Sequence, residues 1–257
     1  MGGYMETSLI LLIPFIGTSL GAAVALLFRK GISSRVEKIF LGFAAGVMIS
    51  ASVWSLLIPS IEAADSCIPA ALGFLCGIGF LLLLDMIIPH LHLESENPEG
   101  LPVKLPKKTM LLFAVTLHNI PEGMAVGIAL AGSLSSESGI TAASALVLSM
   151  GIALQNFPEG AVVSMPLIGE GMSRKKAFAA GVLSGAVEPV AAILTMLFTR
   201  ELSSVLPFLL AFAAGAMMYV VIEELIPESQ AGKHSNIGTV AAAFGFTVMM
   251  VLDVVFG

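Results

Sequence analysis

Eight long apolar runs constrain the fold of this 257-residue chain more than any other feature of its sequence. A helix needs about 20 mainly apolar residues to cross the hydrocarbon core of a bilayer. The runs that reach this length are 8–28, 39–61, 68–89, 109–131, 140–168, 177–199, 206–227 and 237–256. Because they are continuous rather than alternating, they favour helices over a transmembrane β-barrel. The sequence therefore predicts an all-α, multi-pass membrane protein with one transmembrane domain over residues 1–257.

Charge supports this class and predicts an orientation. Only 12% of the residues are charged, against about a quarter in soluble domains, and no basic patch suggests nucleic acid as a partner. Alternate connections between the spans hold nearly all the basic residues: Arg29, Lys30, Arg35, Lys38, Lys104, Lys107, Lys108, Arg174, Lys175, Lys176 and Lys233. The positive-inside rule places these connections in the cytoplasm. An even number of spans then puts both termini outside the cell (inner) membrane.

Two segments of the chain repeat each other in opposite directions. The sequence FAAGVMISASVWSLLIP at 43–59 resembles FAAGAMMYVVIEELIP at 212–227, with one residue deleted. The second and third spans thus recur as the seventh and eighth, and an offset of five spans reverses their direction through the membrane. We predict an inverted repeat of spans 1–3 and 6–8 around a central pair, spans 4 and 5. Such repeats are typical of transporters, with the substrate site at the repeat interface near mid-membrane.

Acidic side chains lie within or close to the spans without basic partners. They are Asp85, Glu122, Glu159, Glu188, Glu223, Glu224 and Asp253, and the one basic residue beside them is His118. A charge at the bilayer centre costs about 2.5–3.5 kcal/mol on insertion scales. Buried carboxylates without a cationic side chain therefore indicate either protonated carboxyls or a bound cation.

The motif HNIPEG at 118–123 returns as QNFPEG at 155–160, on the fourth and fifth spans. In each copy the first residue and the Glu are four positions apart and share a helix face, with an Asn beside them. Pro cannot donate a backbone hydrogen bond, so each motif also frees a carbonyl oxygen one turn earlier. In the sixth span, Glu188 again stands beside a Pro. The candidate ligands are His118, Asn119, Glu122, Gln155, Asn156, Glu159 and Glu188.

A pocket of one imidazole with carboxylate and amide oxygens suits a divalent transition metal. Zn²⁺, Fe²⁺, Mn²⁺ and Cd²⁺ fit this ligand set better than Ca²⁺, and the absence of thiolates argues against a tight structural zinc site. The alternative is polar packing, in which Asn, Gln and His hydrogen-bond between helices. Two spaced copies of the motif, together with Glu188, favour metal binding over packing.

These motifs on consecutive spans, with Glu-Pro on the sixth, resemble the ZIP family of zinc and iron permeases. With Gln155 in place of His, the chain is most similar to the prokaryotic GufA-like branch. The resemblance implies a binuclear metal site on the fourth, fifth and sixth spans, with Met48 as a further thioether ligand. It also implies a homodimer that imports divalent metal, most of all zinc, into the cytoplasm by alternating access. Spans 1, 4, 5 and 6 would then slide against spans 2, 3, 7 and 8.

Further polar residues mark a path through the membrane. The candidates are Ser55 and Glu62 at the entrance, Glu223 and Glu224 at the exit, and His90 and His92 in the cytoplasmic connection 90–108. The histidines of this connection collect or sense metal in one interpretation, and belong to an ordinary solvated loop in the other.

Two other functions would use intramembrane carboxylates. An intramembrane metal-dependent hydrolase acting on phosphates needs Arg, Lys or helix N-termini, and a metalloprotease needs HExxH, which this sequence lacks. A proton-coupled carrier of organic cations needs aromatic faces, and the chain has one Trp and two Tyr. Both functions remain as alternatives to a metal transporter. We predict a transporter rather than an enzyme, with no organic cofactor.

Overall fold

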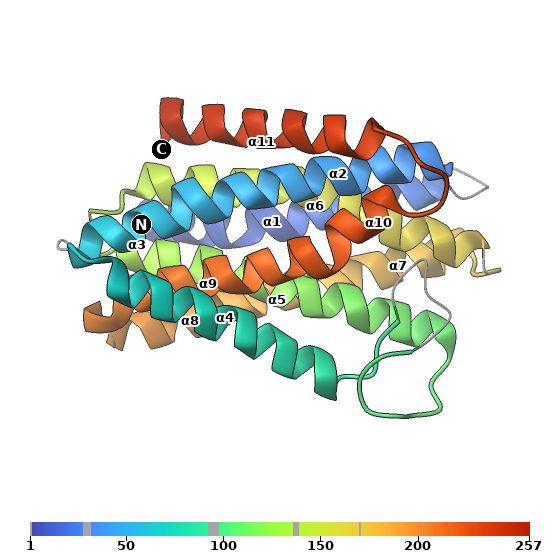
Figure 1. Cartoon of the computed structure of the whole chain (residues 1–257), viewed down its shortest axis with the longest axis horizontal. Helices are drawn as coiled ribbons and strands as arrows, with labels where there is room; N and C mark the ends of the chain where they lie inside the picture. The colour runs from blue at the N-terminus through green and yellow to red at the C-terminus, as the bar shows by residue number, and fades with distance from the viewer. Residues whose placement is uncertain (1, 28–31, 92–97, 136–138, 170, 202) are drawn as a thin grey trace.

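The computed structural model describes residues 2–27, 32–91, 98–135, 139–169, 171–201 and 203–257 (Figure 1). Within them the regular structure is helical, apart from an isolated bridge between His90 and Glu99. The helices are α1 (Gly2–Leu27), α2 (Ser34–Ala51), α3 (Ile58–Ala64), α4 (Cys67–Ile87), α5 (Lys107–Ser133), α6 (Ala142–Gly169), α7 (Arg174–Gly185), α8 (Val187–Glu201), α9 (Leu206–Val220), α10 (Ile226–Gln230) and α11 (Ile237–Phe256). Two π-helical segments, η1 (Ser52–Leu57) and η3 (Val221–Leu225), and a 3₁₀ turn, η2 (Ser203–Val205), join some of them.

Among the described residues, eight helical segments are long and apolar enough to cross a membrane, which confirms the predicted fold class. They are Thr7–Leu27, Ser34–Ala64, Cys67–Ile87, Lys107–Ser133, Ala142–Gly169, Arg174–Thr199, Leu206–Gln230 and Ile237–Phe256. The second span starts earlier than predicted because its first turn is polar. Lys38 anchors that turn by donating a hydrogen bond to the Lys233 carbonyl at 2.8 Å.

The sixth span is one segment, as the sequence predicted, but its helix is interrupted for one residue at Ala186. α7 ends at Gly185, and α8 begins two residues later. Pro189 has no N–H for the Gly185 carbonyl, and its ring crowds the turn before it, which accounts for the break. In contrast, Pro121 and Pro158 lie inside continuous helices. The break places Glu188 in the first turn of α8.

The helices form two bundles that lie side by side (Figure 1). α1, α5, α6, α7 and α8 pack on one another, while α2, α3, α4, α9, α10 and α11 form the second bundle. The bundles meet mainly where α2, α9 and α11 contact α5 and α6. They correspond to the two groups of spans that the family resemblance expects to slide against each other.

Helix packing confirms the inverted repeat. α2 packs along α11, and its repeat counterpart α9 packs along α4. Close contacts recur at matching positions, since a Cβ on Gly77 would collide with the Phe212 carbonyl and one on Gly245 with the Phe43 carbonyl. Glycines at such crossings let helix backbones approach closely. α1 on α6 and α8 on α5 form another matching pair, so the first and sixth spans belong to the repeat despite their dissimilar sequences.

The two π-helical segments also match. Each is followed directly by an Ile-Pro pair, which contains Pro59 after η1 and Pro227 after η3. Neither proline can donate to the carbonyl four residues earlier, at Ser55 or Glu223, and both carbonyls lie within the π-helical segments. A helix that lacks one backbone N–H donor readily forms a π-turn, which changes the direction of the neighbouring side chains.

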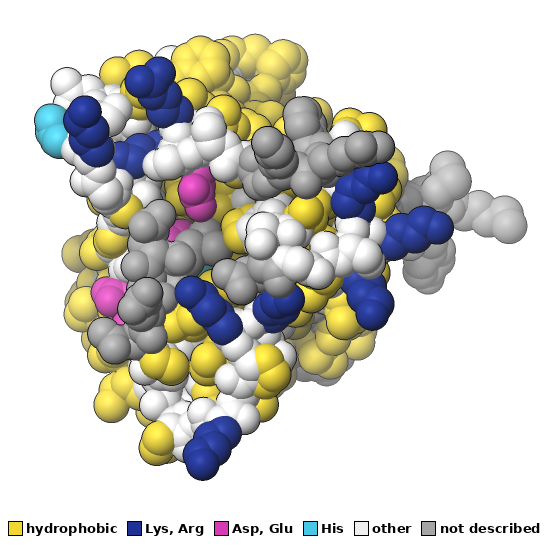
Figure 2. Space-filling view, turned by 90° about the vertical axis from the view of Figure 1, so that its right-hand side faces the viewer, with side chains coloured by type: hydrophobic (Ala, Val, Ile, Leu, Met, Phe, Trp, Pro, Cys, Tyr) yellow, Lys and Arg dark blue, Asp and Glu magenta, His cyan; other side chains and the backbone are white. Residues whose placement is uncertain are grey.

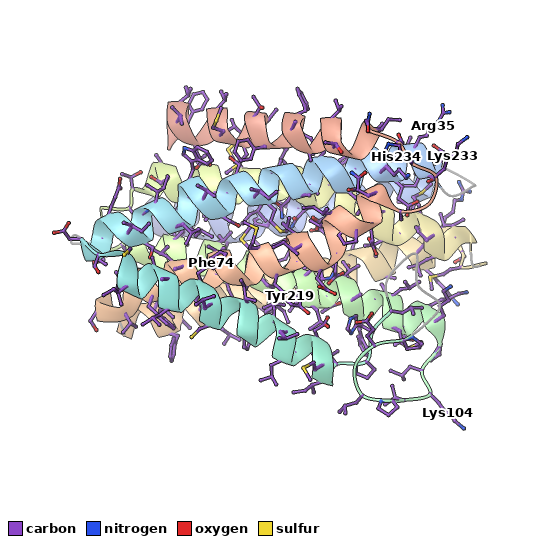
Figure 3. All side chains as sticks on the ribbon, in the orientation of Figure 1. Arg35, Phe74, Lys104, Tyr219, Lys233 and His234 are labelled. Atoms are coloured by element: carbon purple, nitrogen blue, oxygen red, sulfur yellow. The ribbon has the colours of Figure 1, made fainter. Side chains whose placement is uncertain are left out.

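Lys and Arg side chains gather at one end of the molecule (Figure 2). Arg35, Lys104 and Lys233 lie there (Figure 3), and we call it the basic end. α1 begins and α11 ends at the opposite end (Figure 1), which we call the terminal end. This distribution matches the alternation of basic connections along the sequence.

Candidate metal site

The two proline motifs face each other between α5 and α6, midway along both helices. Gln155 Nε2 donates a hydrogen bond to Glu122 Oε1 at 2.8 Å, which links the motifs directly. Both side chains are fully buried. α5 runs away from the basic end and α6 runs toward it, so the two motifs meet in antiparallel fashion.

Glu188 joins this pocket from α8. Thr18 of α1 donates a hydrogen bond to Glu188 Oε1 at 2.6 Å. Asn156 lies beside the carboxyls of both Glu122 and Glu188. Glu159 is close enough to Glu122 and Glu188 for their negative charges to repel one another. The fold therefore brings three predicted carboxylates together, and Thr18 is a partner that the sequence analysis missed.

Several buried oxygens of this pocket have no hydrogen-bond partner among the described residues. They are Glu122 Oε2, Gln155 Oε1, Asn156 Oδ1, Glu159 Oε1 and Glu188 Oε2. A buried polar group without a partner costs about 1–3 kcal/mol, and more when it is charged. Within the described part of the chain, none of the three carboxylates forms an ion pair with Lys or Arg. A divalent cation would satisfy several of these oxygens at once and offset their charge.

Two other predicted ligands, His118 and Asn119, contact residues outside the two motifs in this conformation. His118 Nε2 contacts a carboxylate oxygen of Glu224 in η3. Asn119 Nδ2 donates a hydrogen bond to the Ser184 carbonyl in α7 at 3.0 Å. Glu224, a predicted exit residue, therefore reaches the pocket, whereas its neighbour Glu223 is exposed. Whether His118 and Asn119 bind metal stays a prediction.

Toward the basic end, a small cavity reaches the pocket. Its volume is about 30 Å³, and His118, Glu159, Glu224 and Glu228 line it together with apolar residues. A water molecule needs roughly 10–15 Å³ of such space. The cavity is therefore large enough for water or a small ion.

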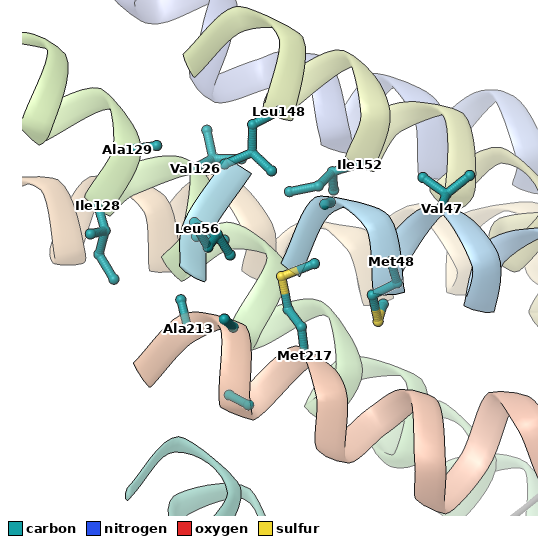
Figure 4. Close-up of a cluster of buried hydrophobic side chains, with 14 of the residues drawn as sticks. Val47, Met48, Leu56, Val126, Ile128, Ala129, Leu148, Ile152, Ala213 and Met217 are labelled. Atoms are coloured by element: carbon teal, nitrogen blue, oxygen red, sulfur yellow. The ribbon is translucent and has the colours of Figure 1, made fainter. Parts of the chain in front are cut away.

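Beyond the two motifs toward the terminal end, α5 and α6 belong to a cluster of buried apolar side chains (Figure 4). This cluster, called the apolar seal below, consists of Met48, Leu56, Val126, Ile128, Ala129, Leu148, Ile152, Ala213 and Met217. Each of them is at most 2% exposed. Met48, predicted as a ligand, packs here with Met217, its counterpart in the repeat. A dry apolar layer of this kind opposes the passage of an ion, because an ion loses its hydration there.

A pocket of about 480 Å³ lies beyond the seal, at the terminal end. Both predicted entrance residues, Ser55 and Glu62, line it together with Asp253 of α11. Ser55 Oγ donates to Asp253 Oδ1 at 2.6 Å, while Asp253 Oδ2 has no hydrogen-bond partner among the described residues. The sequence analysis noted Asp253 as an intramembrane acid but did not connect it with the entrance.

At the basic end, His90 lies in a second group of metal-binding side chains. Ligand atoms of Asp85, His90 and Glu99 lie within 4.8 Å of one another. His90 Nε2 is 3.0 Å from Asp85 Oδ1. The other predicted loop ligand, His92, lies outside the described residues. No sequence pattern linked Glu99 to His90, because the fold of the loop brings them together.

Together, the fold and the pocket define a multi-pass membrane protein with a buried acidic site between α5, α6 and α8, inside one bundle, and Glu224 of the second bundle contacts His118 beside it. Residues 94–253 match the family model described as ZIP zinc transporter. The chain is 35% identical to zinc transporter ZIP11 of Homo sapiens, over 93% of this chain and 94% of that protein. It is 35% identical to zinc transporter ZIPB of Bordetella bronchiseptica (95% and 79% covered) and 34% identical to zinc transporter GufA of Myxococcus xanthus (94% and 96% covered). The chain therefore belongs to the ZIP family of zinc transporters, as the motifs predicted.

Proposed function

We propose that this protein transports divalent transition-metal ions, most of all Zn²⁺, through the pocket between the two proline motifs. The observation that carries this proposal is the set of unpartnered buried oxygens of Glu122, Glu159 and Glu188. Carboxylates, amide oxygens and one imidazole suit Zn²⁺, and also Fe²⁺, Mn²⁺ and Cd²⁺. The names of the relatives, which are zinc transporters, support zinc.

The pocket has enough donors for two neighbouring ions. In this proposal Glu122, Glu159 and Glu188 serve both ions, His118 and Gln155 complete the shell of one, and Asn119 and Asn156 complete the other. The unpartnered amide oxygens of Gln155 and Asn156 support this division. His118 would leave Glu224 when it binds an ion, since its Nε2 cannot serve both. Met48 would act as a further ligand only after the apolar seal rearranges.

Transport requires the pocket to open to each side in turn. The small cavity beside His118 and Glu224 supports release toward the basic end, and the apolar seal opposes leakage toward the terminal end. Sliding of the two bundles would part the seal and admit an ion from the pocket at Ser55 and Glu62. The positive-inside rule places the basic end in the cytoplasm and both termini outside. The direction of transport is then import.

The group of Asp85, His90 and Glu99 lies on the release side. One imidazole with two carboxylates is a suitable ligand set for a transition metal. We infer that this group collects or senses ions after release. A homodimer, as the family resemblance implies, stays a prediction.

Uptake of metal into proteoliposomes that contain the purified protein tests the proposed function. Zn²⁺, Cd²⁺, Fe²⁺ and Mn²⁺ are offered separately to the wild type and to Glu122→Ala. A matched control is Asp65→Asn, because Asp65 is exposed and has a positive φ of 47° that Asn tolerates. We expect saturable zinc uptake by the wild type and the control, and its loss in Glu122→Ala. Well-folded wild type that takes up none of the four ions would overturn the proposal and favour the organic-cation carrier or the hydrolase.

A further inference from the structure

A groove of about 680 Å³ opens on the outside of the molecule between α2, α6 and α11. Its wall is apolar except for Asn236 at its end, and its side chains include Ile39 and Phe43 from α2, Leu154 and Phe157 from α6, and Val240 and Phe244 from α11. Val240 is 67% exposed and Phe244 is 63% exposed. In a protein that spans a membrane, such a surface faces the lipid hydrocarbon.

The position of the groove matches one leaflet of a bilayer. It starts at the basic end, where α11 begins at Ile237, and extends along α11 to Phe244. At 1.5 Å per residue this is about 10 Å, within the roughly 15 Å that half of a 30 Å hydrocarbon core provides. The groove is therefore placed to take an acyl chain whose head group lies at the basic end.

Two exposed cationic residues lie next to groove-lining residues at the basic end. Arg35 lies one turn before Ile39 on α2, and Lys233 lies in the connection just before α11 (Figure 3). Both are exposed, and His234 lies beside them in the same connection. Lys38 holds this connection against α2 through its hydrogen bond to the Lys233 carbonyl. Residues 32–40 and 231–237 contain three Lys or Arg residues, Arg35, Lys38 and Lys233, and one acid, Glu37.

We propose that the groove binds an anionic phospholipid of the leaflet at the basic end. Its phosphate would lie at Arg35 and Lys233, and one acyl chain would lie between α2, α6 and α11. The charge at the mouth selects an anionic lipid over a neutral one, and over an apolar helix of a second copy of the chain. Phe157 belongs to the QNFPEG motif, so the lipid would pack on the outer side of the helical turn that carries the central pocket. The binding does not rest on the proposed transport function.

Quenching of tryptophan fluorescence by lipids with brominated acyl chains tests this proposal. The single Trp is removed by Trp54→Phe, and Phe244→Trp then places a reporter in the groove while keeping an aromatic ring there. The matched reporter is Leu75→Trp on α4, which is 64% exposed and lies outside the groove. Each protein is reconstituted in phosphatidylcholine with increasing fractions of brominated phosphatidylglycerol or brominated phosphatidylcholine.

We expect brominated phosphatidylglycerol to quench the groove reporter at a mole fraction on the order of tenfold lower than brominated phosphatidylcholine does, because two cations lie at the mouth. The α4 reporter should not distinguish the two lipids. Adding Arg35→Gln and Lys233→Gln should abolish the preference in the groove, whereas Lys104→Gln with Lys107→Gln, also at the basic end, should leave it intact. Equal quenching of the groove reporter by both lipids, or a preference that survives the loss of Arg35 and Lys233, would overturn the proposal. No quenching by either lipid, with normal quenching on α4, would show that protein covers the groove and would also overturn it.

Discussion

The two π-helical segments occupy equivalent places in the inverted repeat but carry opposite chemistry. Leu56 of η1 corresponds to Glu224 of η3, each three residues before the matching Pro. Leu56 is fully buried in the apolar seal, whereas Glu224 contacts His118 and lines the small cavity. The same backbone therefore presents an apolar closure on one side of the pocket and a polar exit on the other. The repeat supplies a symmetric frame, and individual side chains make the two sides different.

The aspartates of the repeat show the same contrast. Asp253 accepts a hydrogen bond from Ser55 in the pocket at the terminal end. Its counterpart Asp85 contacts His90 and lies beside Tyr219 at the other end. The first Asp keeps an unpartnered oxygen toward the entrance, while the second belongs to a group with the geometry of a metal site.

Glu224→Leu would give η3, on the exit side, the apolar residue that η1 has at the equivalent position, Leu56. Because Glu224 contacts a predicted ligand, we expect zinc uptake into proteoliposomes to fall by about 10–100-fold. Uptake at the wild-type rate by well-folded protein would show that the difference between η1 and η3 has no role in ion release.

Thr18→Val removes the hydrogen bond that holds one oxygen of Glu188, with little change in volume. A hydrogen bond to a charged group contributes about 1.5–3 kcal/mol, so zinc affinity measured by calorimetry should fall by roughly tenfold or more. Thr18→Ser keeps the hydroxyl and should restore the affinity. Equal affinities for wild type and Thr18→Val would mean that Thr18 does not position Glu188.

Leu56→Ala opens a cavity in the apolar seal. We expect a loss of about 2–5 kcal/mol in the free energy of unfolding, measured by reversible denaturation in detergent. Leu72→Ala on α4 is the matched control, since Leu72 is 55% exposed and its truncation should change stability by about 0.5 kcal/mol or less. If both substitutions had the same small effect, Leu56 would not be part of a packed seal.

Gly77→Ala and Gly245→Ala test whether the two halves of the inverted repeat pack equivalently. Each added methyl group would meet a backbone carbonyl at equivalent crossings, so both should destabilise the protein, by about 1–3 kcal/mol. Gly79→Ala is the control on α4, because a Cβ there meets nothing within 4 Å. A large effect at one crossing and none at the other would contradict the packing equivalence.

Local sequence features predicted most of the fold. Span lengths follow from apolar runs, and the matching segments 43–59 and 212–227 predicted the repeat. The one-residue deletion between these segments falls among the residues that form η1 and η3, but sequence alone did not distinguish a π-turn from a shorter helix. The break before α8 was also missed, because prolines in the other two motifs remain inside continuous helices.

The candidate site was predictable where ligands are spaced four residues apart on one helix, as in the two proline motifs. Contacts between segments far apart in the sequence could not be predicted. Thr18 and Glu188 are 170 positions apart, and a single Thr in an apolar span carries no spacing signal. Glu99 joins Asp85 and His90 only through the path of the loop. The direction of the His118 ring toward Glu224 likewise depends on helix packing and the π-turn.

The central claim is that the buried carboxylates between α5, α6 and α8 hold the transported ion. Anomalous X-ray scattering from crystals grown with Cd²⁺ tests it most directly, because it locates the metal without relying on activity. We predict a cadmium peak between Glu122, Glu159 and Glu188. Cadmium at Asp85, His90 and Glu99, with none in the central pocket, would contradict the claim.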